Sequence, residues 1–207
     1  MLDRRLWSKG RVVAGLDEVG RGCLAGPVYA GALIMDFKAL GKLPKRLRGL
    51  VRDSKRLSPG QRATIRPEIE RIAVKFAVAA ATVEEIEQLN IQGATYLAMR
   101  RALALIGMPI DVLLIDGKLK LPAYQGEQVA IIGGDDLCAS IAAASILAKE
   151  ARDAYMRAQA LVFADYGFDR HVGYGTAFHL GQIEKHGICP LHRRKFAPIT
   201  RMIDAQV

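Results

Sequence analysis

The 207-residue chain carries 30 Lys and Arg against 21 Asp and Glu, and the resulting formal charge of +9 favours a polyanionic partner. No stretch combines a basic face with a broad aromatic face, so nucleic acid is favoured and no membrane is expected as a partner. A content of 51% hydrophobic and 25% charged residues is ordinary for a soluble globular protein, and the length predicts a single domain over residues 1–207.

Neither a targeting signal nor a paired-cysteine pattern is found in the sequence. The segment before the first apolar run, Met1 to Lys9, is too charged and too short for a signal peptide, and no apolar run reaches about 18 residues. Cys23, Cys138 and Cys189 have neither zinc-site nor disulfide spacing. We therefore expect a cytoplasmic protein with reduced, structural thiols.

The first predicted element is a short apolar strand at residues 12–16 that ends on two adjacent carboxylates, Asp17 and Glu18. A buried ionised carboxylate costs several kcal/mol, and two neighbouring ones repel each other. Such a site must therefore hold a metal or an arginine, or keep a proton. Arg21 is the nearby basic residue in the sequence.

A glycine-rich loop follows the two carboxylates. Gly20 and Gly22 flank Arg21, and glycine on both sides permits a sharp bend and the close approach of a ligand. Taken alone, a solvated turn with a hairpin loop explains residues 17–22 equally well. Residues 27–35, however, carry no charge and predict a second buried strand that runs back beside the first, which favours a metal-binding strand end beside a ligand-binding loop.

These motifs resemble the opening signature of bacterial ribonuclease HII, the type 2 ribonucleases H. The resemblance rests on Asp17-Glu18-Val19-Gly20-Arg21-Gly22 and on Leu24-Ala25-Gly26-Pro27-Val28. The family more often has proline at the position of Cys23, a departure that lies outside the carboxylates. The resemblance implies that Asp17 and Glu18 are catalytic metal ligands and that residues 20–22 contact the substrate.

Residues 36–56 are predicted to be a basic connection, which ends in Asp53-Ser54-Lys55. Its basic residues are Lys38, Lys42, Lys45, Arg46, Arg48, Arg52, Lys55 and Arg56. A solvated loop explains the segment by itself, and a phosphate-contacting loop is the functional alternative. In the ribonuclease HII family a similar Asp-Ser-Lys segment lies near the substrate backbone, so the resemblance assigns Lys55 to substrate binding.

Helices and strands alternate after this connection. Ser58 and Pro59 begin a helix that extends to residue 72, because serine is a favoured N-cap and proline suits the first helical position. Pro67 is expected to kink or split this helix. The elements predicted next are a strand at 74–82, a short helix at 83–89 and a longer helix at 91–106.

A strand at 111–116 also ends on an acid, Asp116, which is followed by glycine. A sheet that carries acids at the ends of neighbouring strands brings them together in space, so Asp116 is expected near Asp17. An Asp-Gly turn explains an isolated example of this pattern, but two similar strand ends weaken that explanation. Type 2 ribonucleases H carry their third acid after this strand, and the resemblance therefore assigns Asp116 to the site.

A strand at 128–132 leads to Asp135 and Asp136 and then to a helix at 137–160. Small side chains dominate this helix, which lets it pack close to the sheet and hold the acid at its N-terminus in place. Either acid can cap the helix or bind metal. Alignment with the family's Ala-Ser-Ile-Leu-Ala-Lys segment implies that Asp135 is the fourth acid, although Gly133 stands where the family commonly has lysine.

Four residues of the C-terminal third are of interest, namely His171, His179, His192 and the aromatic residue Tyr174. His171 and His179 lack zinc-site spacing, and no cysteine completes a ligand set, so metal binding by histidine is not expected. Tyr174 lies between glycines and suits either core packing or a stacking platform for a sugar or base. The resemblance assigns Tyr174 to substrate contact and leaves His192 structural, while Lys195 stands where the family usually has serine.

The order of the elements predicts an α/β fold with a central mixed sheet and a mostly helical C-terminal region. The resemblance adds that this is a ribonuclease H-like sheet flanked by helices. Successive residues of a strand point to opposite faces, which poses a geometric difficulty for two adjacent metal ligands. Either the strand bends at Asp17 and Glu18, or Glu18 contributes partly through its carbonyl.

Four carboxylates without histidine ligands suit Mg²⁺ or Mn²⁺ rather than zinc. Two such ions about 4 Å apart would activate water and stabilise the leaving oxygen in phosphodiester hydrolysis. The resemblance implies a metal-dependent endonuclease that hydrolyses the RNA strand of RNA/DNA hybrids and cuts on the 5′ side of ribonucleotides embedded in duplex DNA. Its products would be 5′-phosphate and 3′-hydroxyl ends, and we expect a monomer without an obligatory protein partner.

Three alternatives share some of these features. A resolvase or exonuclease of the same broad fold would also cluster acids, and it would cut all-DNA substrates. A noncatalytic RNA-binding protein would share the basic charge, bind hybrids without divalent metal and never cut them. Ribonuclease HIII resembles the chain less, because it lacks this Gly-Arg-Gly form and carries an extra N-terminal domain for which residues 1–9 leave no room.

Overall fold

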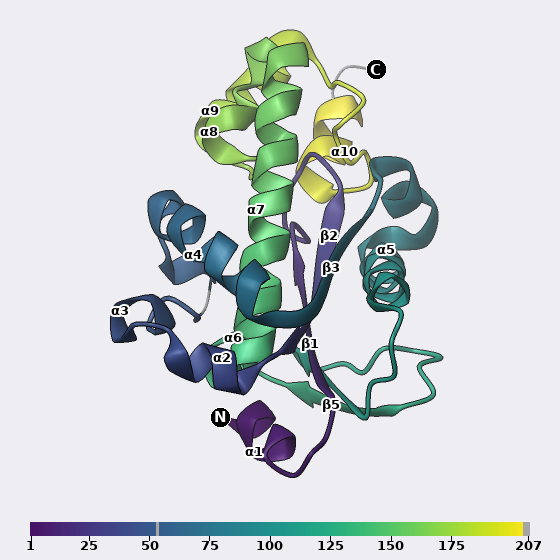
Figure 1. The fold of residues 1–207 in the computed structure, drawn as a ribbon. Coiled ribbons are helices and arrows are strands. Elements are labelled where there is room, and N and C mark those ends of the chain that lie inside the picture. Colours follow the sequence, from purple (N-terminus) through teal and green to yellow (C-terminus); the bar gives the residue numbers. More distant parts are fainter. Residues whose placement is uncertain (53, 205–207) are drawn as a thin grey trace.

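The computed structural model describes residues 1–52 and 54–204, and it contains a five-stranded sheet with helices on both faces (Figure 1). The order across the sheet is β3-β2-β1-β4-β5. The pairs β1–β2 and β2–β3 are antiparallel, and the pairs β1–β4 and β4–β5 are parallel. The predicted mixed sheet with its antiparallel strands first is therefore confirmed. The strands are β1 (Val13–Val19), β2 (Val28–Met35), β3 (Ala73–Ala81), β4 (Val112–Asp116) and β5 (Glu127–Ile131).

Helices occupy most of the remaining chain. The longest are α7, which lies along one face of the sheet, and α5, which covers the other face (Figure 1). The helices are α1 (Leu2–Trp7), α2 (Phe37–Lys42), α3 (Lys45–Arg48), α4 (Pro59–Ile72), α5 (Val83–Ile106), α6 (Gly134–Leu137), α7 (Ala139–Val162), α8 (Phe168–His171), α9 (Ala177–His186) and α10 (Ala197–Asp204), with short 3₁₀ turns η1 (Ser54–Arg56) and η2 (Ala164–Tyr166).

Alternate residues of β1 face the two long helices. Leu16 is fully buried in a cluster with apolar residues of α5. Gly15 faces α7 so closely that a Cβ built on it would lie 2.2 Å from the backbone carbon of Ser140. Because side chains alternate along a strand, Asp17 continues the face of Gly15 and Glu18 continues the face of Leu16. The pairing of β1 with β2 runs through both acids without a shift, so the strand does not bend to bring them together.

The close packing of α7 extends to β2. A Cβ on Gly31 would lie 2.3 Å from the carbonyl oxygen of Ala144, which faces it from the helix. Alanines and serines fill this part of α7 and are buried. The prediction that small residues bring the helix against the sheet is confirmed, and the segment that carries Asp135 is thereby fixed relative to β1 and β2.

Residues 36–56 are more ordered than the basic loop expected from the sequence. Asp36 caps α2 by accepting hydrogen bonds from the backbone N–H groups of Lys38 and Ala39. Phe37 and Leu40 of this segment are buried in an apolar core cluster that includes residues of the sheet. The connection therefore contains α2, α3 and η1, and apolar burial accounts for α2, which the high charge content of the segment did not indicate.

Three other helix boundaries test the sequence analysis. Pro67 lies inside α4, which continues as one helix to Ile72, so the predicted split is wrong. Asn90, with φ 57° and ψ 171°, interrupts α5, and the predicted division into two helices is confirmed there. The helix predicted at 137–160 is interrupted at Cys138, which has extended backbone geometry between α6 and α7.

The C-terminal helices gather around one end of α7 (Figure 1). Their own apolar cluster contains Phe168, Ile183 and Ile199 from this region, together with Met156 of α7 and Leu24 of the glycine-rich loop. The predicted helical C-terminal region is confirmed. Because Leu24 belongs to this cluster, the C-terminal region also supports the loop that follows β1.

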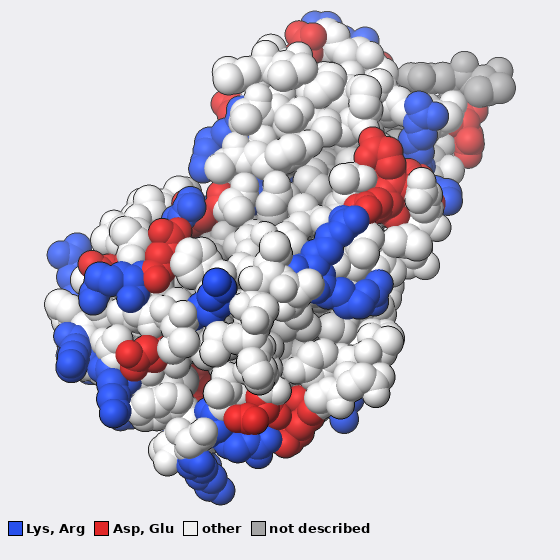
Figure 2. Space-filling view, turned by 45° about the vertical axis from the view of Figure 1, so that its right-hand side comes forward, with Lys and Arg blue, Asp and Glu red and all other residues white. Residues whose placement is uncertain are grey.

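The surface carries positive charge in several places rather than in one patch. Figure 2 shows blue Lys and Arg side chains interleaved with red Asp and Glu side chains. Part of this pattern consists of ion pairs within helices, such as Arg66 with Glu70 and Arg71 with Glu68 on α4. Within residues 1–52 and 54–204, no helix is both long enough and apolar enough to span a membrane. All three cysteines are buried and free, as predicted.

Candidate active site

Three carboxylates meet at one edge of the sheet. Asp17 lies on β1, Asp116 ends β4, and Asp135 lies on α6, which follows β5. One carboxylate oxygen from each lies within 4.8 Å of the others. The geometry has a simple origin, because β1 and β4 are parallel neighbours with Leu16 opposite Ile115, so the residue after each occupies the same edge. The convergence predicted from two similar strand ends therefore occurs.

Two acids of the cluster, Asp17 and Asp116, have no ion-pair partner among the described residues. Asp17 is only 5% exposed. Burial raises the pKa of Asp17 well above its usual range, and repulsion from Glu18 and Asp116 raises it further. The Ser145 hydroxyl and the N–H of Glu18, which donates to Asp17 Oδ1 at 2.7 Å, oppose this shift. A bound cation would remove the repulsion.

Asp116 and Asp135 are held by the turn between β5 and α6. The N–H of Gly134 donates to Asp116 Oδ1 at 2.7 Å, and Asp135 is 9% exposed. Gly133 has φ 66°, a left-handed conformation that glycine adopts without steric cost. Asp136 points elsewhere and forms an exposed ion pair with Arg56 at 3.3 Å. The structure therefore separates the two neighbouring acids in the way that the alignment predicted.

Glu18 lies on the other face of β1 and is not one of the three clustered acids. Its Oε1 accepts a hydrogen bond from Arg21 Nη1 at 3.2 Å, and Arg21 Nη2 donates to Gln92 Oε1 at 2.8 Å. Burial raises the pKa of Glu18, while Arg21 opposes the shift. These residues line a cavity of about 390 Å³ that reaches Asp116 and Lys118. A role for Glu18 as a metal ligand therefore remains a prediction.

Two buried arginines support the loop from Gly20 to Pro27. Arg193 donates to the carbonyl oxygens of Gly20 at 2.7 Å, Arg21 at 2.9 Å and Gly26 at 2.7 Å. Arg152 donates to the carbonyls of Ala25, Pro27 and Val172. A Cβ on Gly20 would lie 2.2 Å from Arg152 Nε, so glycine is required there both for space and for its φ of 94°. Sequence reasoning missed both arginines, although Arg193 directly follows His192.

Lys55 lies on η1, beside the acid cluster. The hydroxyl of Ser54 is 2.9 Å from that of Ser145, and Ser145 interacts in turn with Asp17. Lys55 itself is exposed, and its charge acts on Glu18. Asp53, the first residue of the predicted Asp-Ser-Lys motif, lies outside the described residues. The structure therefore brings the predicted substrate-contacting lysine to the rim of the site.

Tyr174 lies beside the glycine-rich loop and is 40% exposed. The N–H of Leu24 donates to the carbonyl of Gly173 at 2.8 Å, which joins the two segments. Lys149 Nζ lies 5.6 Å from the centre of the tyrosine ring. Burial of its inner part raises the pKa of the Tyr174 hydroxyl. An accessible ring next to this loop is compatible with the predicted stacking role.

Three of the four histidines, His171, His179 and His192, form a buried network. His179 Nδ1 lies 2.9 Å from the carbonyl of Tyr174, and its Nε2 lies 3.1 Å from His192 Nε2. The N–H of Cys189 donates to His192 Nδ1 at 2.8 Å. Burial lowers the pKa of His179 and of His192 to about 4, so both are neutral at pH 7. A neutral imidazole ring has one donor and one acceptor nitrogen, so neighbouring rings can form a continuous chain of hydrogen bonds. This chain reaches the carbonyl of Tyr174 and holds that residue in position.

A family model described as Ribonuclease HII matches residues 14–199. The chain belongs to the ribonuclease HII family. It is 47% identical to a ribonuclease HII from Synechococcus sp. (strain CC9902) over 187 residues, which cover 90% of this chain and 92% of the relative. The protein is therefore a hydrolase that acts as an endonuclease on RNA/DNA hybrids.

Solved structures support the fold. The ribonuclease H2 from Pyrococcus horikoshii OT3 matches with a TM-score of 0.75 and 24% identity, and the match covers 93% of this chain and 97% of that one. The Bst-RNase HIII crystallised with Mn²⁺ matches with a TM-score of 0.66 and 21% identity, covering 94% of this chain and 70% of that one. The ribonuclease H-like sheet predicted from the sequence is confirmed.

The donor set of this ribonuclease HII family member fits a divalent metal. Asp17, Asp116 and Asp135 supply only carboxylate oxygens, which are the ligands that hard cations prefer. Neither Asp17 nor Asp116 forms an ion pair with a residue in the ranges 1–52 and 54–204. Histidines lie elsewhere, in the network behind Tyr174. The site is thus suited to Mg²⁺ or Mn²⁺ and unsuited to zinc.

Proposed function

We propose that the protein, acting as a single catalytic domain, cleaves the RNA strand of RNA/DNA hybrids and also cuts on the 5′ side of single ribonucleotides in duplex DNA. The products would be 5′-phosphate and 3′-hydroxyl ends. The observation that carries this proposal is the position of three clustered carboxylates immediately beside the loop 20–22. We further propose that the enzyme works as a cytoplasmic monomer.

Asp17, Asp116 and Asp135 would hold Mg²⁺ or Mn²⁺. Such ions lower the pKa of bound water and stabilise the leaving oxygen of a phosphodiester. The protein's part is to keep the three carboxylates rigid and close together before substrate arrives. Ser145 and the N–H of Gly134 serve this purpose, because each forms a hydrogen bond to one of the acids and fixes its rotamer.

Glu18 completes the proposed set from the opposite face of β1. Its side chain is oriented by Arg21, and its carboxylate shares a cavity with Asp116. In this proposal Glu18 acts either through its carbonyl, as the alternation of the strand suggests, or after release from Arg21 when substrate binds. Glu18→Gln separates these possibilities, because it removes the carboxylate charge and leaves the carbonyl in place.

The loop 20–22 is proposed to distinguish RNA from DNA. The carbonyls of Gly20 and Arg21 accept hydrogen bonds from Arg193, whereas the N–H groups of Arg21 and Gly22 donate to no acceptor in the described part of the chain. A 2′-hydroxyl both donates and accepts hydrogen bonds, so it can accept from these N–H groups. Tyr174 would pack on the neighbouring sugar, and Lys55 would contact the phosphate backbone.

A single cleavage assay tests the proposal. Labelled duplexes of all-DNA, of RNA/DNA hybrid and of DNA with one ribonucleotide are incubated with Mg²⁺ and, separately, with Mn²⁺. We expect cutting of the hybrid and cutting 5′ of the single ribonucleotide, and no cutting after its 2′-hydroxyl is replaced by hydrogen or O-methyl. Efficient cleavage of the all-DNA duplex would contradict the ribonuclease assignment.

Tyr174→Ala tests the proposed sugar contact. We expect it to impair cutting at a single ribonucleotide more than cutting of a long hybrid, because neighbouring hydroxyls of a hybrid offer alternative registers. Thr176→Ala, a change in the same segment that leaves the ring intact, is the matched control. Equal losses on both substrates would show that Tyr174 only packs the protein.

A further inference from the structure

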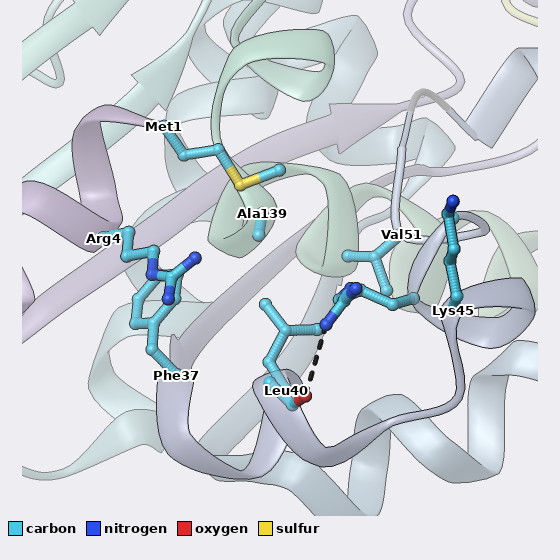
Figure 3. A pocket seen from close by; sticks show the side chains of 10 residues that line it. Met1, Arg4, Phe37, Leu40, Lys45, Val51 and Ala139 are labelled. Carbon is cyan, nitrogen blue, oxygen red and sulfur yellow. Dashed lines mark hydrogen bonds between the residues drawn. The ribbon is translucent and has the colours of Figure 1, made fainter.

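A second cavity lies away from the acid cluster, between α1, α2, α3 and the start of α7 (Figure 3). Its volume is about 590 Å³, within the range of pockets that bind small ligands or inserted side chains. None of the clustered acids and none of the proposed substrate contacts borders it. The lining residues are Met1, Arg4, Phe37, Leu40, Gly41, Lys45, Arg48, Gly49, Val51 and Ala139.

The floor of this cavity is apolar and firmly held. Phe37, Leu40 and Val51 are each buried and belong to the same core cluster as Ala139. The ring of Phe37 is packed against Trp7 with their centres 5.6 Å apart. An apolar floor that already exists in the free protein can accept an apolar group without rearrangement of the core.

The rim of the cavity is basic. Arg4 comes from α1 and Lys45 from α3, and they lie on opposite sides of the apolar floor in Figure 3. Arg48 of α3 also lines the cavity and donates to the carbonyl of Gly41 at 3.2 Å, which orients its guanidinium. In the described ranges 1–52 and 54–204, none of these three cations forms an ion pair.

The residues that line the cavity limit the kinds of ligand that can bind there. Among the described residues it contains no acidic, amide or hydroxyl side chain. A nucleotide would bury base and ribose donors without partners, which is unfavourable. A duplex backbone satisfies the cations but offers no apolar group to the floor. A peptide segment with an apolar side chain between carboxylates can contact both parts of the cavity, because the apolar group packs on the floor and the carboxylates pair with the basic residues of the rim.

We propose that this cavity binds an acidic segment of a partner protein, with one apolar side chain inserted over Phe37, Leu40 and Val51 and with flanking carboxylates at Arg4 and Lys45. This interaction would tether the partner to the enzyme outside the substrate site. The proposal is independent of which nucleic acid the enzyme cuts, since it uses none of the residues assigned to that reaction.

The test measures binding of a defined peptide by fluorescence anisotropy. The probe is a fluorescein-labelled peptide with one leucine between two pairs of aspartates. Two matched peptides replace the leucine by serine or all the aspartates by asparagine. We expect the first peptide to bind at least tenfold more tightly than either control, because each control removes one of the two complementary features.

Gly41→Phe is the blocking variant. A Cβ built on Gly41 meets no heavy atom within 4 Å, and the backbone there is not left-handed, so we expect the fold to tolerate the change while the ring fills the cavity mouth. Gly181→Phe on α9 is the matched control, since a Cβ there is equally unobstructed. We expect peptide binding to fall at least tenfold in the first variant only, with hybrid cleavage unchanged in both.

Lys45→Glu provides a second route if Gly41→Phe does not fold. We expect this charge reversal to weaken the aspartate peptide and leave the asparagine peptide unchanged, whereas Lys185→Glu, an exposed change of equal charge, affects neither. Equal binding of the leucine and serine peptides would overturn the proposal. Loss of hybrid affinity in Gly41→Phe equal to the loss of peptide affinity would also overturn it, because the cavity would then belong to the nucleic-acid surface.

Discussion

Two groups of buried charged side chains lie near the glycine-rich loop at residues 20–27, and they differ in how well the protein compensates their charge. Arg152 and Arg193 are completely buried, yet each donates to several backbone carbonyls. Asp17 is almost as deeply buried, but it accepts few hydrogen bonds and is repelled by its acidic neighbours. The two arginines thus have several hydrogen-bond acceptors inside the protein, whereas Asp17 is left with repulsion from Glu18 and Asp116.

This difference separates a structural role from a functional one. A buried charge that is fully hydrogen-bonded inside the protein stabilises one conformation of its partners. A buried charge that lacks a partner makes the folded protein less stable until a ligand supplies the opposite charge. The arginines therefore hold the glycine-rich loop in one conformation, whereas a bound cation would stabilise Asp17 in its ionised form. Four changes, in order of decreasing expected effect, test the comparison.

Asp17→Asn should reduce cleavage by at least about 10³-fold, because it removes a proposed metal ligand. The fold should persist and should be no less stable in the presence of a chelator, since the variant removes a buried carboxylate that is repelled by Glu18 and Asp116. Single-turnover cleavage with Mg²⁺ and thermal unfolding with and without chelator measure the two effects. Retained turnover with Mg²⁺ would contradict the assignment.

Arg193→Met should have the opposite signature, with the larger effect on stability. Loss of the guanidinium leaves the carbonyls of Gly20, Arg21 and Gly26 without their donor, and we expect a loss of about 3–5 kcal/mol in the free energy of unfolding. Arg194→Met, an exposed neighbour, is the control and should change stability by less than about 0.5 kcal/mol. Urea denaturation distinguishes them, and equal effects would show that the buried hydrogen bonds matter little.

These two predictions also mark where sequence reasoning succeeded and failed. Asp17 and Asp116 could be picked out because each follows an apolar run, a pattern that is local in the sequence, and the resemblance to the ribonuclease HII family supported Asp116. The choice of Asp135 over Asp136 rested on that resemblance alone. Arg152 and Arg193 donate to carbonyls that lie 125 and 173 residues away, and a backbone acceptor leaves no trace in the identity of its residue. The helices within residues 36–56 were missed for a related reason, because charged residues outnumber the few apolar residues, such as Phe37 and Leu40, whose burial supports α2.

Acidification should weaken the support behind Tyr174. The pKa values of His179 and His192 in the folded protein are about 4, below the ordinary value of 6.5. The unfolded chain therefore binds more protons between pH 6.5 and pH 4, so the free energy of unfolding falls as pH decreases through this window, by on the order of 3 kcal/mol for one such histidine.

Urea denaturation at several pH values between 7 and 4 measures this effect. His192→Gln should flatten the dependence on pH, because it removes one titrating ring from the pair that are 3.1 Å apart. His186→Gln, at the exposed end of α9, is the control and should leave the slope unchanged. An identical slope in the wild-type protein and in His192→Gln would exclude this pair as its source.

Lys55→Ala should produce the smallest change, which concerns affinity alone. An exposed lysine that neutralises one phosphate contributes about one unit to the slope of log affinity against log salt concentration, and its removal should weaken hybrid binding by about 1 kcal/mol at low salt. Lys185→Ala is the control for a remote lysine. Binding titrations at several salt concentrations decide the matter, and an unchanged slope would remove η1 from the substrate site.

The close packing of α7 limits which changes in chain length the protein can accept. Four contacts spaced along this helix join Gly15 to Ser140, Gly31 to Ala144, Gly20 to Arg152 and Gly26 to Met156. They extend over about 24 Å of helix, and one inserted residue would rotate everything beyond it by about 100°. The acids and the glycine-rich loop would then no longer be held in fixed positions relative to each other. Insertions should therefore be absent from α7 in functional variants, whereas the more exposed residues 122–126 can vary in number.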